Sequence, residues 1–69
     1  MHWEVGPGDH MWAIARSTLT VRLGRGVEER EVRAYWRKLI AANRGRLVDP
    51  DNPDLILPGQ LFRLPPSSG

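Results

Sequence analysis

Apolar and polar residues alternate near both ends of the chain, and this pattern predicts two short strands. Residues Trp3–Val5 are apolar, charged and apolar in turn, which is the period of a half-buried strand. The Gly-Pro-Gly run at 6–8 ends this strand, because glycine and proline favour turns. Residues 60–64 alternate in the same way and predict a second strand, which the two prolines at 65–66 end.

Between these two strands, apolar residues recur at helical spacing and predict two helices. A first helix is expected from His10 to about Thr20, with Asp9 as its N-cap. One face of this helix carries Met11, Ile14, Ala15 and Thr18. After a loop at 22–26, a second helix is expected at 27–43. Glutamates in its first turn and bases in its later turns suit the helix dipole, and Gly45 is the expected C′ residue.

The element order strand–helix–helix–strand predicts a small α+β module. The two strands are expected to pair antiparallel, with both helices packed on one face of the sheet, because two strands alone are marginal in water. Residues 1–66 form a single domain in this interpretation, and residues 67–69 form a flexible C-terminal tail. A loop rich in proline, aspartate and asparagine at 46–59 leads into the second strand.

Length and composition exclude several classes of function. A chain of 69 residues without cysteine is too small for a large multi-step enzyme and has no thiolate for a disulfide or a metal. The net charge of +2 is too low to argue for nucleic-acid binding. No apolar run is long enough to span a membrane, and the first residues lack the pattern of a signal peptide.

Chemistry-bearing residues show no catalytic or metal-binding pattern. No pair of carboxylates is spaced for acid–base work on a sugar. His2 and His10 form no metal-ligand pattern with a carboxylate, and no phosphate-binding loop is present. We therefore expect no enzyme activity, no cofactor and no metal, and a binding module is the default.

Two segments at the ends of the helical pair carry a family resemblance. The first is Val5-Gly-Pro-Gly-Asp-His-Met-Trp-Ala-Ile-Ala15, and the second is Asn52-Pro-Asp-Leu-Ile-Leu-Pro-Gly-Gln60, followed by the last strand. With Ala41-Ala-Asn43 between them, the chain resembles the LysM family of β-α-α-β modules over residues 3–65. It departs from the family in having His10 and Met11 where Thr or Ser and Leu are usual, and in a longer segment between the helices.

The resemblance implies a groove for N-acetylglucosamine glycans between these two segments. It carries the site over to Gly8, Asp9, His10, Met11, Pro53, Asp54, Leu55 and Ile56. Backbone N–H groups at the start of the first helix could bind an acetamido carbonyl, because the first four lack intrahelical partners. Prolines should keep residues 54–57 extended with their amides free, and Leu55 or Ile56, with Met11 opposite, should form a notch for the acetyl methyl group.

Each of these residues also has a purely structural interpretation. Asp9 can be only a helix cap, Met11 only a core residue, and His10 only a solvent-exposed side chain. Asp54 can fix an Asx turn, and at least one residue of Leu55–Leu57 must lie in the core. The three tryptophans can be stacking platforms or core filling; Trp36 and Phe62 are the strongest expectations for the core.

The resemblance implies a non-catalytic, monomeric module that binds peptidoglycan, or a chitin-type oligosaccharide, and tethers a larger protein to the cell wall, outside the cell or in the periplasm. One alternative keeps the fold but has a degenerate groove, and serves as a structural or protein-contact domain. Another is a small basic nucleic-acid binder, although the interleaved glutamates oppose this. It would use Arg22, Arg25, Arg30, Arg33, Arg37 and Lys38.

Overall fold

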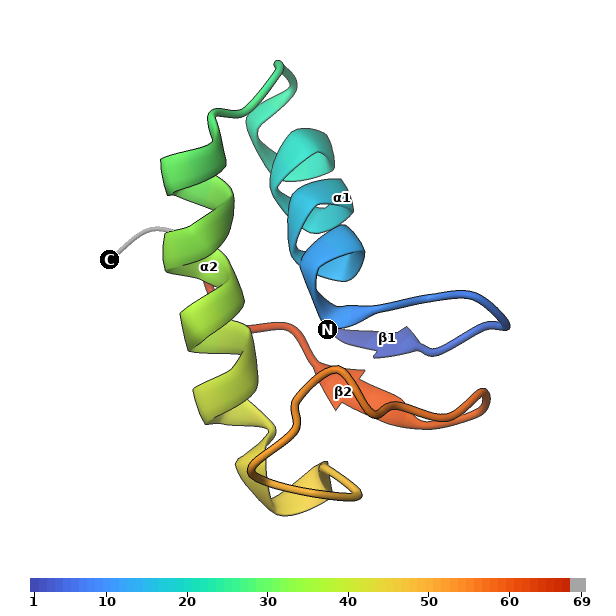
Figure 1. Ribbon diagram of the computed structural model, residues 1–69. Coiled ribbons are helices and arrows are strands. Elements are labelled where there is room, and N and C mark those ends of the chain that lie inside the picture. Colours follow the sequence, from blue (N-terminus) through green and yellow to red (C-terminus); the bar gives the residue numbers. More distant parts are fainter. Residues whose placement is uncertain (68–69) are drawn as a thin grey trace.

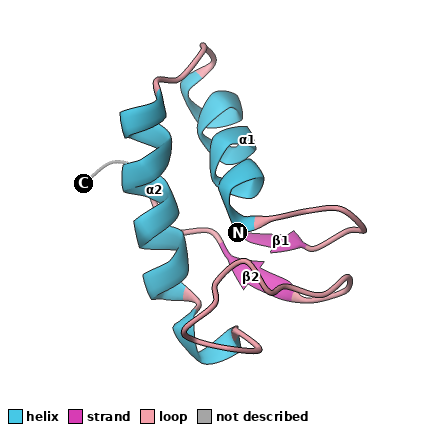
Figure 2. Ribbon diagram, in the orientation of Figure 1, coloured by secondary structure: helices cyan, strands magenta, loops and turns pink. Residues whose placement is uncertain are grey.

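The computed structural model describes residues 1–67 and shows a β-α-α-β module (Figures 1 and 2). Along the chain lie strand β1 (His2–Glu4), helix α1 (Met11–Leu23), helix α2 (Glu29–Ala42), the short 3₁₀ helix η1 (Arg44–Arg46) and strand β2 (Leu61–Arg63). The expected α+β class and element order are confirmed. The expected tail falls mainly on residues 68 and 69, which lie outside the described residues.

The two strands form an antiparallel sheet in which Trp3 faces Phe62. The ladder continues past both ends of β1. The Val5 N–H donates to the Gln60 carbonyl at 2.8 Å, and the Leu64 N–H donates to the Met1 carbonyl at 2.9 Å. Strand β1 (His2–Glu4) starts one residue before the expected Trp3–Val5. Strand β2 (Leu61–Arg63) covers only the middle of the expected 60–64.

Both helices pack together and cover the sheet, and the core lies where they meet it (Figure 1). Phe62 reaches this core from β2, Met11 and Ile14 from α1, and Tyr35 and Leu39 from α2; all five are fully buried. Phe62 is thus confirmed as a core residue.

The three tryptophans only border the core, since Trp3, Trp12 and Trp36 are half-buried and pack against it. Trp12 and Trp36 join the two helices through tilted rings whose centroids lie 5.7 Å apart. Trp36 was expected inside the core, but it is half-buried at the border of the core.

The ends of the helices differ from the expected ones, for local reasons. Helix α1 continues to Leu23 and ends at Gly24, whose φ of 66° is the left-handed geometry that glycine adopts without strain. Helix α2 starts only at Glu29, because the Glu31 side chain accepts from the N–H of the N-cap residue Glu28 at 3.0 Å. Gly45 is not a C′ residue: it lies inside η1, without the positive φ of such a cap.

Asn43, at the end of α2, joins the helices to the sheet. Its side-chain Nδ2 donates to the carbonyls of Leu39 and Arg63, both at 2.8 Å, and its Oδ1 accepts from the Arg63 N–H at 2.7 Å. Asn43 is fully buried. It takes the place of a neighbouring strand at the outer edge of β2, where backbone groups would otherwise be unpaired.

The segment after β2 is fixed by two side chains that share one acceptor. The carbonyl of Pro65 accepts from the Tyr35 hydroxyl at 2.7 Å and from the Arg22 guanidinium at 2.6 Å. Arg22 also lies over the Tyr35 ring, 5.6 Å from its centroid. Burial raises the pKa of the Tyr35 hydroxyl, so it remains a donor at neutral pH. These contacts attach the end of the chain to both helices.

Candidate ligand-binding loops

The turn between β1 and α1 is organised around the Asp9 carboxylate. Its Oδ2 accepts from the Gly6 N–H at 2.8 Å and from the Trp3 indole Nε1–H at 3.1 Å. The Asp9 N–H in turn donates to the Gly6 carbonyl at 3.1 Å, and Gly8 has a φ of 85°, which favours glycine. Because these hydrogen bonds favour the ionised form, they hold the pKa of Asp9 below its usual range.

The expected N-cap role of Asp9 was wrong, because the helix begins one residue later than expected. The N-cap is His10, with extended backbone and an imidazole Nδ1 that accepts from the Ala13 N–H at 3.3 Å. With Nδ1 accepting, the exposed His10 ring has Nε2–H as its outward donor. Asp9 closes the turn instead, and His10 is confirmed as exposed.

The carboxylate-centred turn predicts a loss of stability in acid. The folded state lowers the pKa of Asp9 relative to the unfolded chain, so its contribution is present above about pH 4 and is lost as the pH falls further. Glu31, whose pKa the Arg25 guanidinium lowers to about 2, adds to the same loss at lower pH. We expect Asp9→Asn to lower the melting temperature at pH 7 and to weaken its dependence on pH between about 4 and 2.

Thermal unfolding followed by circular dichroism over this pH range measures the effect. A matched control is Asp51→Asn, since the exposed Asp51 carboxylate has no hydrogen-bond partner within residues 1–67. Equal pH profiles for the wild type and Asp9→Asn would contradict the role of Asp9 in the turn.

The loop before β2 is more closed than the sequence suggested. The N–H of Leu55 donates to the Asn52 carbonyl at 3.0 Å, and that of Ile56 to the Asp54 carbonyl at 3.1 Å. The N–H of Leu57 donates to the Gln60 side chain at 2.6 Å. The expectation of free amides at 54–57 was therefore wrong for 55–57, whose N–H groups are used by turn geometry and by a glutamine side chain. The carbonyls of Leu55 and Ile56 accept no hydrogen bond from residues 1–67.

Backbone hydrogen bonds hold the two loops side by side where each meets the sheet. The Gly59 N–H donates to the Val5 carbonyl at 2.7 Å, and the Val5 N–H donates to the Gln60 carbonyl at 2.8 Å. Gly59 has a φ of 91°, which allows this tight return into β2. Figure 1 shows both loops extending beyond the same end of the sheet. These bonds join Val5 to 59–60, and none links the expected residues 8–11 directly to 53–56.

Seven of the eight expected site residues have some exposed surface. Gly8, His10, Asp54 and Leu55 are exposed, whereas Asp9, Pro53 and Ile56 are half-buried. Met11 is fully buried in the core, so its expected place in the groove was wrong: the first turn of α1 points its side chain toward the sheet. Ile56 packs against the same core, and Leu55, 41% exposed, is the apolar side chain among the expected site residues that remains for a ligand.

Asp54 and Gln60 have different roles from those the sequence indicated. The Asp54 carboxylate accepts no hydrogen bond from residues 1–67, so the expected Asx turn is not formed; Asp49 forms one with the Asp51 N–H at 2.9 Å. Gln60 braces the loop, because its Nε2 also donates to the Arg46 carbonyl at 3.1 Å. The Pro-Gly-Gln sequence at 58–60 was the signal for this brace.

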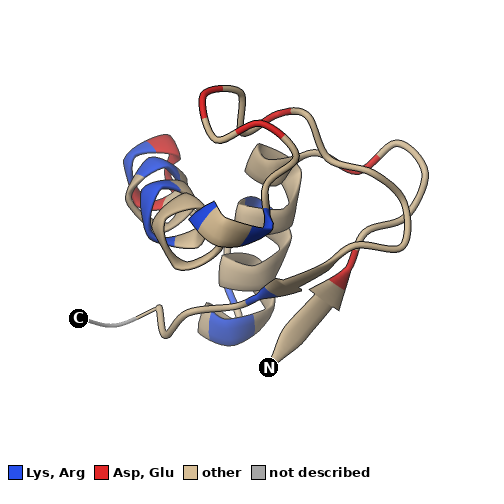
Figure 3. Cartoon of the chain, turned by 90° about the horizontal axis from the view of Figure 1, so that it is seen from below, with Lys and Arg blue, Asp and Glu red and all other residues tan. Residues whose placement is uncertain are grey.

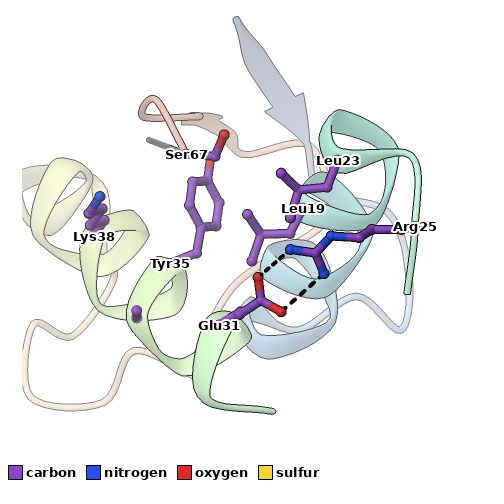
Figure 4. Close-up of a pocket in the computed structure, with 8 residues that line it drawn as sticks. Leu19, Leu23, Arg25, Glu31, Tyr35, Lys38 and Ser67 are labelled. Atoms are coloured by element: carbon purple, nitrogen blue, oxygen red, sulfur yellow. Dashed lines mark hydrogen bonds and ion pairs between the residues drawn. The ribbon is translucent and has the colours of Figure 1, made fainter. Parts of the chain in front are cut away.

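Two hollows lie on other surfaces of the described chain. One, of about 240 Å³, lies between α1 and α2 and contains the Arg25–Glu31 ion pair at 2.8 Å beside Tyr35 and Lys38 (Figure 4). The other, of about 340 Å³, is an apolar groove between β1 and α1. Neither is lined by an expected site residue, so any ligand at the two loops would bind an open surface.

Acidic residues lie in the loops and at the start of α2, whereas most basic residues lie on the helices (Figure 3). Five acidic residues lie in β1 and the loops: Glu4, Asp9, Asp49, Asp51 and Asp54. Bases concentrate on the helices, where Arg30 and Arg33 are paired with Glu28 and Glu29. The loop surface therefore suits a neutral polar ligand better than a phosphate backbone.

No family model, curated protein or solved structure matches this chain. Residues 1–67 contain no helix long and apolar enough to cross a membrane, and no cluster of side chains in that range could hold a metal ion.

Proposed function

We propose that the protein is a non-catalytic module that binds N-acetylglucosamine-containing glycans, bacterial peptidoglycan above all, at the two loops beyond the end of the sheet. The observation that supports this most directly is the pairing of Val5 with Gly59 and Gln60, which keeps the β1–α1 turn beside the loop before β2. The likeness of both segments to LysM motifs points to the same pair of loops.

The loops offer the groups that an acetamido sugar requires. At the start of α1, the N–H group of the exposed His10 has no intrahelical partner and donates to no residue in 1–67, so it can bind an acetyl carbonyl. On the other loop, the carbonyls of Leu55 and Ile56 can accept from the sugar amide or hydroxyls. The exposed Leu55 side chain can contact the acetyl methyl group.

The open surface at the two loops determines how tightly a single module can bind a glycan. Hydrogen bonds to a sugar replace bonds to water of similar strength, so we expect weak binding by a single module. Several modules on one polymer would raise the apparent affinity through effective concentration. This suits a module that tethers a larger protein to a cell wall.

Titration with defined glycans, followed by amide chemical shifts, tests the proposal. We expect chitin oligosaccharides or soluble peptidoglycan fragments to shift the signals of Gly8–Met11 and Asp54–Leu57. Leu55→Asp should weaken binding by about tenfold, because it places a charge against the acetyl group. Val21→Asp is a matched control, since Val21 is 81% exposed and lies on α1, in the groove beside β1.

Shifts confined to α2, or equal affinities of the wild type and Leu55→Asp, would contradict the assignment of the loops. Absence of any response to either glycan would reject glycan binding. It would favour the protein-contact alternative, which the apolar groove beside β1 supports.

A further inference from the structure

The outer edge of β1 has backbone groups that pair with nothing in residues 1–67. In an antiparallel ladder, successive residues point their N–H and C=O groups alternately toward and away from the partner strand. Because Met1 and Val5 bond to the β2 side, His2 and Glu4 point their backbone groups away from it. Figure 3 shows β1 at the rim of the molecule, with β2 on one side only. At the corresponding edge of β2, the Asn43 side chain pairs with the N–H and the carbonyl of Arg63.

An apolar surface adjoins this open edge. The groove of about 340 Å³ between β1 and α1 is lined by Met1, Trp3, Val21 and Leu64, among others. Met1 is 83% exposed and Val21 is 81% exposed, which are high values for large apolar side chains. A strand added to β1 would therefore gain backbone hydrogen bonds along the edge and apolar contacts beside it.

The sequence of β1 is complementary to itself in antiparallel pairing. If two copies of β1 pair about a twofold axis at Trp3, His2 of each copy lies opposite Glu4 of the other. This register makes each His2–Glu4 pair a hydrogen-bonded pair that uses the outward N–H and C=O groups of both residues. Both side chains are exposed, on the face of the sheet away from the core. A base then faces an acid in both pairs, which favours this register.

We propose that β1 is the interface of a weak homodimer in which two β1 strands pair antiparallel and form a four-stranded sheet. The two Trp3 residues then face each other on the helical side of the sheet, where non-hydrogen-bonded pairs lie closest, and the apolar grooves meet along α1. A second copy is the occupant that the basic and acidic side chains of His2 and Glu4 select. The pairing also relieves the marginal stability of a two-stranded sheet.

The interface is distinct from the candidate glycan loops. The loops lie beyond the end of β1, and antiparallel pairing points those of the two copies in opposite directions. Glycan binding and dimerisation can therefore fail independently: Leu55→Asp is expected to leave self-association unchanged.

Sedimentation equilibrium of the whole chain over a range of concentrations tests the dimer. We expect the apparent mass to rise from one chain toward two. His2→Glu places like charges in both cross-strand pairs and should weaken association by about tenfold. The double variant His2→Glu with Glu4→His restores opposite charges and should recover it. Val21→Asp, in the groove, should also weaken it.

Glu4→Pro tests the backbone bonds separately, because it removes an N–H that points away from β2 and should abolish association. Circular dichroism of each variant checks that the fold is retained, and the exposed charge variants keep the test valid if Glu4→Pro unfolds. A wild type that stays monomeric at millimolar concentration would overturn the proposal. So would a dimer that the His2→Glu and Val21→Asp substitutions leave unchanged.

Discussion

Phe62→Ala is expected to leave much of the protein unfolded at 25 °C. Phe62 is fully buried at the centre of β2, opposite Trp3. Removing a buried phenylalanine ring costs about 3–5 kcal/mol, because transfer energy and packing are both lost. A chain of 69 residues has a free energy of unfolding of only about 3–10 kcal/mol. Urea unfolding followed by far-UV circular dichroism measures the loss.

The neighbouring residue provides the control for this substitution. Leu61 lies on the same strand but is 55% exposed, so Leu61→Ala should change the free energy of unfolding by less than about 1 kcal/mol. Similar losses for Phe62→Ala and Leu61→Ala would show that the side chains of β2 are not divided between the core and solvent as the structure has them.

Asn43→Ala is expected to lower the free energy of unfolding by about 2–4 kcal/mol. The substitution removes three hydrogen bonds and leaves the Arg63 N–H and two carbonyls without their partner in a buried place. Urea unfolding gives the total loss. Amide hydrogen exchange gives the local one: the exchange of the Arg63 N–H should accelerate beyond the change expected from global stability.

Asn52→Ala is the matched control, because Asn52 is exposed in the loop before β2 and its side chain forms no hydrogen bond with residues 1–67. Asn43→Asp tests the donor role separately, since it turns the Nδ2 donor into an acceptor that faces the Leu39 and Arg63 carbonyls. If Asn43→Asp were as stable as the wild type, the three-bond arrangement would be wrong.

Phe62 and Asn43, whose substitutions should lower stability most, differ in how far the sequence predicts their roles. Phe62 was a strong expectation for the core, because an aromatic residue in the middle of an alternating segment is a typical inward position. Asn43 was only the last residue of a helix and part of a motif. Nothing local to residue 43 reveals that its amide completes a strand edge formed twenty residues later, at Arg63.

The turn before α1 shows how contacts with the preceding strand and turn override an intrinsic capping preference. Aspartate is a better N-cap than histidine by intrinsic preference. Yet the Asp9 carboxylate has two donors from β1 and the turn, the Trp3 indole and the Gly6 N–H, and His10 caps the helix. In the loop before β2, the side chain of Gln60, three residues further along the chain, uses the Leu57 amide that was expected to be free.

The sequence by itself determined the two helices, the two strands and their antiparallel order. These follow from residue periodicity, from glycine and proline, and from the need to cover a two-stranded sheet. Only the tertiary structure decided that Met11 is buried and that the Asn43 side chain pairs with Arg63 at the outer edge of β2. Periodicity acts over a few neighbouring residues, whereas those features depend on hydrogen bonds and packing between segments far apart in the chain.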